Sequence, residues 1–235
     1  MKDSTLKKIK KQPIVIEGFP GFGLVSSIVT EFLISHLSCE KIDEHYFDEL
    51  PANIAIHEGK LVEPIGIYYN ERFNVVIIHS IIAGNGIEWK AADFVIDLCN
   101  KVKAKELISI EGVGSGEESK GRTFFFTTDN KKSEELKLLG LKPMKEGIIM
   151  GVTSALLLKK NLPMTCIFGE ANSEIPDNNA AAKIVEILDD IIGFNVDPKP
   201  LRQSAKLFEE KYRAIFEQMG NATKEKDKKT LSYVG

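Results

Sequence analysis

Three glutamates stand beside glycines at the ends of short apolar segments, a placement that could carry chemistry. They are Glu17 before Gly18, Glu111 before Gly112, and Glu170 after Gly169. If the apolar segments are parallel strands, these carboxylates meet at one crevice, the usual ligand site of an open α/β sheet. Carboxylates there, with Asp177 as a further candidate, can bind a metal ion or act as acid and base. Because no histidine is partnered with them in sequence, we favour the alternative that loop amides hydrogen-bond to each carboxylate.

A second candidate is the glycine-rich turn Gly18–Gly23, which joins the first apolar segment to a predicted helix. Such a turn can hold a phosphate because the amides at a helix N-terminus are free. The spacing here is not the dinucleotide pattern, and no Lys-Ser or Lys-Thr pair follows for a nucleoside triphosphate. Phe19 and Phe22 also make the turn hydrophobic. We therefore interpret it as a packing turn, built on Gly18, Pro20, Gly21 and Gly23.

Serine, histidine and cysteine residues give no recognisable catalytic pattern. His79 and Ser80 end the most apolar segment, and two serines lie in the first predicted helix, but no nucleophile-elbow sequence surrounds them. The three cysteines are widely spaced, so they form neither a disulfide framework nor a zinc motif. We assign no catalytic residue, no metal ligand and no cofactor.

The C-terminal segment is a candidate for binding a partner. Residues Asn221–Lys229 are polar and charged, which predicts a flexible linker. A small apolar and aromatic cluster follows it, formed by Leu231, Tyr233, Val234 and Gly235. Such a cluster can dock in a groove on a partner while the linker supplies reach. An ordinary terminus without a role is an equally open alternative.

The elements that position these residues follow from hydrophobic periodicity. Short apolar segments predict buried strands at Pro13–Glu17, Asn74–His79, Glu106–Glu111 and Pro163–Phe168. Apolar residues at three- and four-residue steps predict helices at Phe22–Leu37, Ile87–Val102, Ala180–Ile192 and Pro200–Met219. Ile54–His57 and Ile65–Tyr69 read as paired strands around a turn at Gly59 and Lys60. The order of elements indicates an α/β fold whose sheet is mostly parallel but mixed, with helices on both faces.

Composition limits the class of protein. The 235 residues carry a formal net charge of -3, with 43% hydrophobic and 28% charged residues, as in ordinary globular proteins. This charge argues against nucleic acid or an anionic membrane as a partner. We predict a basic N-terminal segment (1–12), an α/β core (13–195), a C-terminal helix (196–220), and a flexible linker and tail (221–235). Since no signal-peptide pattern is recognised, we expect a cytoplasmic protein.

Three segments resemble a known family. They are Ile16–Val25, Gly147–Leu157 and Gly169–Asp177, the last followed by Ala180–Ala182 and a helix. Their order and spacing are similar to those of the proteasome-assembly chaperone family, second-subunit type, with its archaeal homologues. The resemblance implies a three-layer α/β/α fold like that of nucleoside phosphorylases, without their enzyme activity. It also implies a homo-oligomer that binds proteasome α subunits or the 20S core particle and assists or regulates its assembly.

Members of that family that bind the proteasome ring often end in a hydrophobic residue, a tyrosine and one further residue. Here Tyr233 is third from the end and follows Ser232, so the register of the tail departs from that pattern. Two other interpretations stay open. One is a phosphorylase- or hydrolase-like enzyme that uses the strand-end carboxylates, and the other is an oligomeric scaffold for a different partner.

Overall fold

A computed structural model of the protein describes residues 6, 8–50, 54–57, 60–82, 86–114, 121–159, 162–171 and 176–203. The strands are β1 (Ile14–Gly18), β2 (Glu40–His45), β3 (Ala55–His57), β4 (Lys60–Val62), β5 (Ile65–Asn70), β6 (Val75–Ser80), β7 (Glu106–Gly114), β8 (Thr123–Thr127), β9 (Lys142–Pro143) and β10 (Met164–Ala171). The helices are α2 (Val25–His36), α3 (Glu88–Val102), α4 (Asn130–Leu138), α5 (Gly151–Lys159), α6 (Asn178–Ile192) and α7 (Lys199–Gln203). A short 3-10 helix, η1 (Phe22–Leu24), leads into α2.

One mixed sheet organises the described residues, with the strand order β2-β5-β6-β1-β7-β10-β8-β9. The four central strands β6, β1, β7 and β10 run parallel to one another. β5 is antiparallel to β6, β2 is antiparallel to β5, and β8 is antiparallel to β10. The prediction of a mixed sheet with a parallel centre is therefore confirmed.

The predicted pairing of Ile54–His57 with Ile65–Tyr69 is wrong. β3 pairs with β4 in a separate two-stranded sheet, whereas β5 lies between β2 and β6 in the large sheet. Burial explains the difference. β5 is buried along almost its whole length, while Ile56 of β3 and Leu61 of β4 are exposed. A strand buried on both faces needs neighbours within the large sheet, so β5 pairs there.

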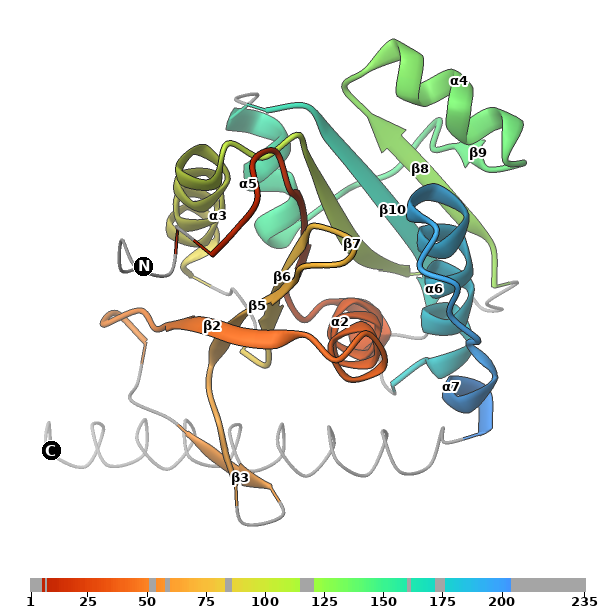
Figure 1. Cartoon of the computed structure of the whole chain (residues 1–235). Helices are drawn as coiled ribbons and strands as arrows, with labels where there is room; N and C mark the ends of the chain where they lie inside the picture. Colours follow the sequence, from red (N-terminus) through yellow and green to blue (C-terminus); the bar gives the residue numbers. More distant parts are fainter. Residues whose placement is uncertain are drawn as a thin grey trace, which may run out of the picture.

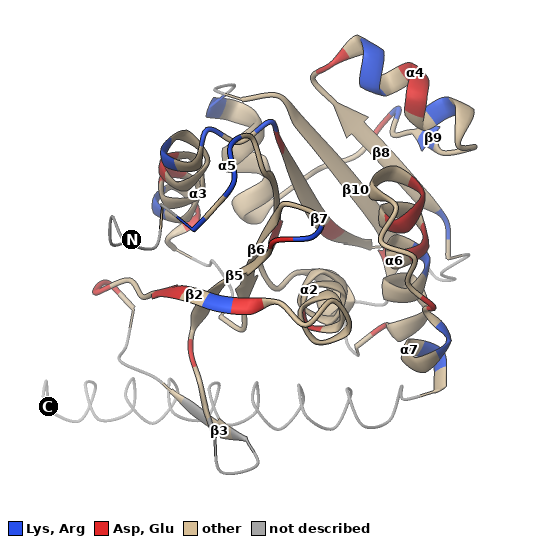
Figure 2. Ribbon diagram, viewed as in Figure 1, with Lys and Arg blue, Asp and Glu red and all other residues tan. Residues whose placement is uncertain are grey.

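The helices form a layer on each face of the sheet, which confirms the three-layer α/β/α architecture. α2, α6 and α7 cover one face, α3 and α5 cover the other, and α4 packs on β8 and β9 at one end (Figure 1). Figure 2 shows that α2 carries almost no charge, whereas α4 alternates basic and acidic residues. This contrast follows burial, because α2 buries eight of its residues and α4 buries only Leu136. No helix in these ranges is both long and apolar enough to cross a membrane.

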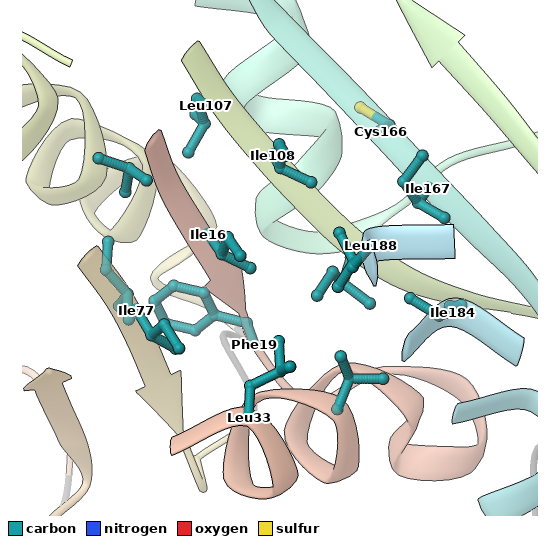
Figure 3. Close-up of a cluster of buried hydrophobic side chains, with 14 of the residues drawn as sticks. Ile16, Phe19, Leu33, Ile77, Leu107, Ile108, Cys166, Ile167, Ile184 and Leu188 are labelled. Carbon is teal, nitrogen blue, oxygen red and sulfur yellow. The ribbon is translucent and has the colours of Figure 1, made fainter. Parts of the chain in front are cut away.

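The core between the sheet and the layer of α2 and α6 consists mainly of branched aliphatic side chains. Ile16 of β1, Ile108 of β7 and Ile167 of β10 gather there with Leu33 of α2 and Leu188 of α6 (Figure 3). All five are excluded from solvent. β-Branched residues such as isoleucine favour the strand conformation. Burial of the apolar side chains in this core supplies the main driving force for folding.

Helix α6 begins and ends at residues typical of those positions. The Asp177 carboxylate accepts a hydrogen bond from the Ala180 amide at 2.9 Å, so Asp177 is the N-cap. Gly193 follows the helix with φ 79°, a conformation that favours glycine. α7 begins within the predicted C-terminal helix, and the remainder of that prediction lies outside the described residues.

Leu188→Ala should lower the free energy of unfolding by about 2 to 5 kcal/mol, because it removes a fully buried side chain and leaves a cavity. Urea denaturation followed by circular dichroism measures the change. Leu138→Ala on α4 is the matched control, since Leu138 is 89% exposed and its loss should cost less than about 0.5 kcal/mol. Equal effects of the two substitutions would contradict the described packing of α6.

Candidate functional site

A wide cleft of about 1090 Å³ opens at the carboxyl ends of the parallel strands. Its walls come from the glycine-rich turn, from β7 and β8, and from the segment that precedes α5. Most of the wall is apolar, with contributions from Phe19, Phe22, Phe124, Met144, Ile149 and Val152. The polar residues of the cleft are Glu111, Arg122, Lys142, Lys145, Glu146 and Glu170. The cleft therefore combines apolar walls with charged groups at its floor and rim, as ligand sites commonly do.

Two glycines allow the turn Gly18–Gly23 to come close to strand β7. A Cβ atom at Gly112 would overlap the backbone carbonyl of Phe22, and one at Gly21 would collide with the Glu111 carboxylate. Gly23 has φ 60°, and its carbonyl accepts a hydrogen bond from the Asp177 amide at 2.8 Å. The turn thus lies against β7 on one side and against the start of α6 on the other.

Two of the candidate carboxylates, Glu17 and Glu111, are joined by a chain of hydroxyl groups. The Ser109 hydroxyl contacts the Glu17 carboxylate and lies 2.9 Å from the Thr153 hydroxyl, which in turn lies 2.9 Å from Glu111 Oε2. Glu17, Ser109 and Glu111 occupy β1 and β7 on the face covered by α5, and Thr153 comes from the first turn of α5. Strands β1 and β7 and helix α5 together build this chain of hydrogen-bonded side chains.

The hydrogen bonds of this chain require a proton on one carboxyl group. Three contacts link the four side chains, but the hydroxyls of Ser109 and Thr153 supply only two protons. A carboxyl proton on Glu17 or Glu111 completes the set. The two hydroxyls thus connect the carboxyls, so the titrations of Glu17 and Glu111 are coupled.

Burial acts in the same direction on both carboxyls. It raises the pKa of Glu17 from 4.5 to about 7, against the opposing effect of the Ser109 hydrogen bond. Burial, and after it the negative charge of Glu17, raises the pKa of Glu111 to about 8. Both carboxyls therefore keep their protons up to about pH 7. In this state Glu111, which lines the cleft, can donate a hydrogen bond or give up a proton.

The other two acidic candidates have different surroundings. Glu170 lines the same cleft, and its carboxylate accepts hydrogen bonds from Arg122 Nε at 2.8 Å and from the Arg122 amide at 3.1 Å. The Arg122 guanidinium also lies over the Phe124 ring, 5.6 Å from its centroid. Asp177 caps α6 and does not line this cleft. The structure thus groups Glu17 with Glu111 and pairs Glu170 with a cation.

Histidine and serine side chains near the turn serve the packing of α2. His79 Nδ1 lies 2.8 Å from the Thr30 hydroxyl on the face of the sheet opposite the carboxyl chain. Ser27 donates to the Ser80 carbonyl at 3.0 Å, and Ser26 donates to the Phe19 carbonyl. Within the described ranges, no group of three or more His, Cys, Asp or Glu residues is arranged to hold a metal ion.

Sequence reasoning missed Ser109 and Thr153. Ser109 stands two residues before Glu111, and residues two apart on a strand share a face, so the pattern could have identified it. Thr153 joins the site only because α5 packs on that face, and no local pattern indicates this. The predicted tail residues Leu231, Tyr233, Val234 and Gly235 lie outside the described residues, so their role stays a prediction.

Known proteins share this architecture. A family model described as the PAC2 family matches residues 15–215. The solved structure of PbaA from Pyrococcus furiosus, an archaeal homolog of proteasome-assembly chaperone, is 30% identical with a TM-score of 0.80, over 92% of this chain and 96% of that chain. A protein of unknown function from Thermoplasma acidophilum has a TM-score of 0.84 at 18% identity, over 95% and 93% of the two chains. PbaB from Pyrococcus furiosus, an archaeal proteasome activator, has a TM-score of 0.72 at 22% identity, over 87% of this chain and 93% of that chain.

Proposed function

The chain belongs to the PAC2 family, and on that basis we propose that it is a non-catalytic chaperone that binds proteasome α subunits or their ring. In this role it assists or regulates assembly of the 20S core particle, as a cytoplasmic homo-oligomer. The observation that carries the proposal is the likeness to Pyrococcus furiosus PbaA, which extends over 92% of this chain at 30% identity. PbaA is described as a homolog of proteasome-assembly chaperone, so a related role is the most economical inference for this chain.

The arrangement of polar groups supports the non-catalytic part of the proposal. The Ser109 hydroxyl is fully buried and contacts a carboxyl, and His79 lies on the other face of the sheet. A serine nucleophile needs a neighbouring base and access to substrate. Burial also raises the pKa of the Cys99 thiol to about 12 and that of Cys166 still further, which makes both thiols poor nucleophiles.

Co-purification with recombinant proteasome α subunits tests the proposal. The full-length chain should retain the α subunits on an affinity column. Removal of residues 230–235 should weaken this retention at least tenfold if the tail docks, as loss of an interface hot spot does. Tyr233→Ala should reproduce the loss, because an aromatic anchor carries much of such an interaction, and Ser232→Ala is the control in the same segment.

The outcomes separate the tail from the core. If the full-length chain and the truncated chain bind equally, the tail has no part in docking and the folded core carries the interaction. If neither binds, the proposal is wrong. Capture of a different protein as the main partner from the native host would favour the scaffold interpretation instead.

A further inference from the structure

The β3–β4 hairpin presents apolar side chains to solvent. Ile56 and Leu61 are cross-strand partners, so they lie on one face of the hairpin, and they are 65% and 60% exposed. Ile54, two residues before Ile56, is exposed as well. Among the described helices and strands, β3 and β4 pack chiefly on each other, and β3 lies apart from the large sheet (Figure 1). Because a two-stranded hairpin is only marginally stable alone, this one gains stability from a further surface that covers its apolar face.

The hairpin leaves the large sheet at the edge where the cleft opens. β4 is followed closely by β5, and Ile65 at the start of β5 pairs with Ser80, the last residue of β6. β6 is parallel to β1, and β1 is parallel to β7, so the hairpin and the cleft both lie beyond the carboxyl ends of the parallel strands. No described residue of the hairpin lines the cleft of its own chain, and β6 separates β5 from β1.

The hairpin and the cleft differ in charge. Residues 40–63, which include β2 and the hairpin, contain seven acidic and two basic residues and therefore have a net charge of -5. At the rim of the cleft, two exposed lysines stand beside a single glutamate, namely Lys142 and Lys145 beside Glu146. The other titratable groups of the cleft are the Arg122–Glu170 ion pair and the Glu111 carboxyl, which keeps its proton up to about pH 7. The cleft is thus free of the excess negative charge that surrounds the hairpin.

We propose that the β3–β4 hairpin of one copy of the chain docks in the cleft of a second copy. In this contact Ile56 and Leu61 pack against the apolar wall of the cleft and against Ile148 and Met150, which are exposed at its edge. The rim lysines attract the acidic residues beside the hairpin, which favours encounter in the correct orientation. The inference rests on the homo-oligomer named in the proposed function and assigns its contact surfaces, but it does not need proteasome binding.

A second copy fits the cleft better than a small molecule or an unrelated partner, because this chain supplies both complementary surfaces. The cleft volume of about 1090 Å³ exceeds the usual range of small-molecule sites, about 300 to 1,000 Å³. It has room for several side chains of a protein segment. Since the hairpin and the cleft lie beyond the same edge of the sheet, two copies related by a twofold axis can exchange hairpins reciprocally. Such an isologous contact closes on itself and covers both hairpins.

Sedimentation velocity of the full-length chain over a concentration series tests the proposal. The wild type should self-associate, and the association should weaken as NaCl is raised, because salt screens exposed charges. Ile56→Asp should raise the dissociation constant at least tenfold, since it places a charge in the apolar contact. The double variant Lys142→Glu, Lys145→Glu should also weaken the association, and added NaCl should then no longer reduce it. Leu138→Asp on α4 is the control, because Leu138 is also an exposed apolar residue, and it should associate as the wild type does.

Cysteine cross-linking identifies the contact surfaces directly. Chains with Ile56→Cys are mixed with chains with Met150→Cys and treated with a short bismaleimide. Cross-linked dimers should be the main product of this mixture. A mixture of Leu138→Cys with Met150→Cys should give no more than the wild type, which reports the background from the half-buried Cys39 thiol.

The outcomes distinguish this contact from the proposed function. A wild type that stays monomeric at every concentration would overturn both the contact and the homo-oligomer. Self-association that is unchanged in either the Ile56→Asp or the lysine variant, an equal loss in Leu138→Asp, or no cross-link between positions 56 and 150 would overturn the contact alone. Failure to retain proteasome α subunits, measured separately by co-purification, would overturn the chaperone function and leave the contact standing.

Discussion

Gly112→Ala is expected to lower the free energy of unfolding by about 2 to 4 kcal/mol, which is a large effect for one methyl group. The new Cβ would overlap the carbonyl oxygen of Phe22, a backbone atom that cannot rotate away. Either the turn that contains Phe22 or strand β7 must move. Since β7 pairs with both β1 and β10 at the centre of the sheet, the turn should move, and the start of α2 should move with it.

The same strand supplies a matched control two residues later. A Cβ at Gly114 would lie 3.6 Å from the nearest atom of the Phe22 ring, an ordinary contact. Gly114→Ala should therefore leave the stability within about 0.5 kcal/mol of the wild type. Chemical denaturation of both variants measures the difference. Similar values for the two variants would show that the turn does not approach β7 as closely as described.

Glycine also explains why strands β7 and β10 are longer than the sequence predicts. The strands expected at Glu106–Glu111 and Pro163–Phe168 each stop just before a glycine, Gly112 and Gly169. In the structure β7 continues to Gly114 and β10 continues to Ala171, with Gly112 and Gly169 paired to each other. Each glycine lies in the strand because another segment packs closely there, Phe22 on Gly112 and Ile184 on Gly169. Such close approaches are tertiary, so no local pattern reveals them.

The central strands and long helices were predictable because their apolar patterns are strong and local. The candidate site was predictable only in part. Strand-end glutamates were identifiable from the sequence, but their tertiary partners were not: Glu17 and Glu111 are linked through hydroxyl groups, whereas Glu170 binds Arg122, which directly precedes β8. Thr153 completes the pair because α5 delivers it from 42 residues along the chain. Local sequence contains no information about that contact.

The stability of the protein should fall as the pH rises from about 5 to about 8 and then level off. Glu17 and Glu111 have folded-state pKa values of about 7 and about 8, raised from 4.5 mainly by burial. Between about pH 4.5 and these raised pKa values, the folded state keeps carboxyl protons that the unfolded state has released. Their contribution is therefore complete below about pH 4.5 and lost as the pH passes the raised values. For Glu17 alone the loss is on the order of 3 kcal/mol.

Glu17→Gln separates this effect from the titration of other groups. The amide can still accept a hydrogen bond from Ser109 but cannot ionise, so the variant should lose much less stability between about pH 5 and about pH 9 than the wild type does. Above pH 8 the variant should be the more stable of the two, since it avoids a buried negative charge. Glu134→Gln, at an exposed ion pair of α4, should keep the wild-type dependence. Parallel stability curves for Glu17→Gln and the wild type would mean that Glu17 does not hold a proton in the folded state, which would contradict its raised pKa.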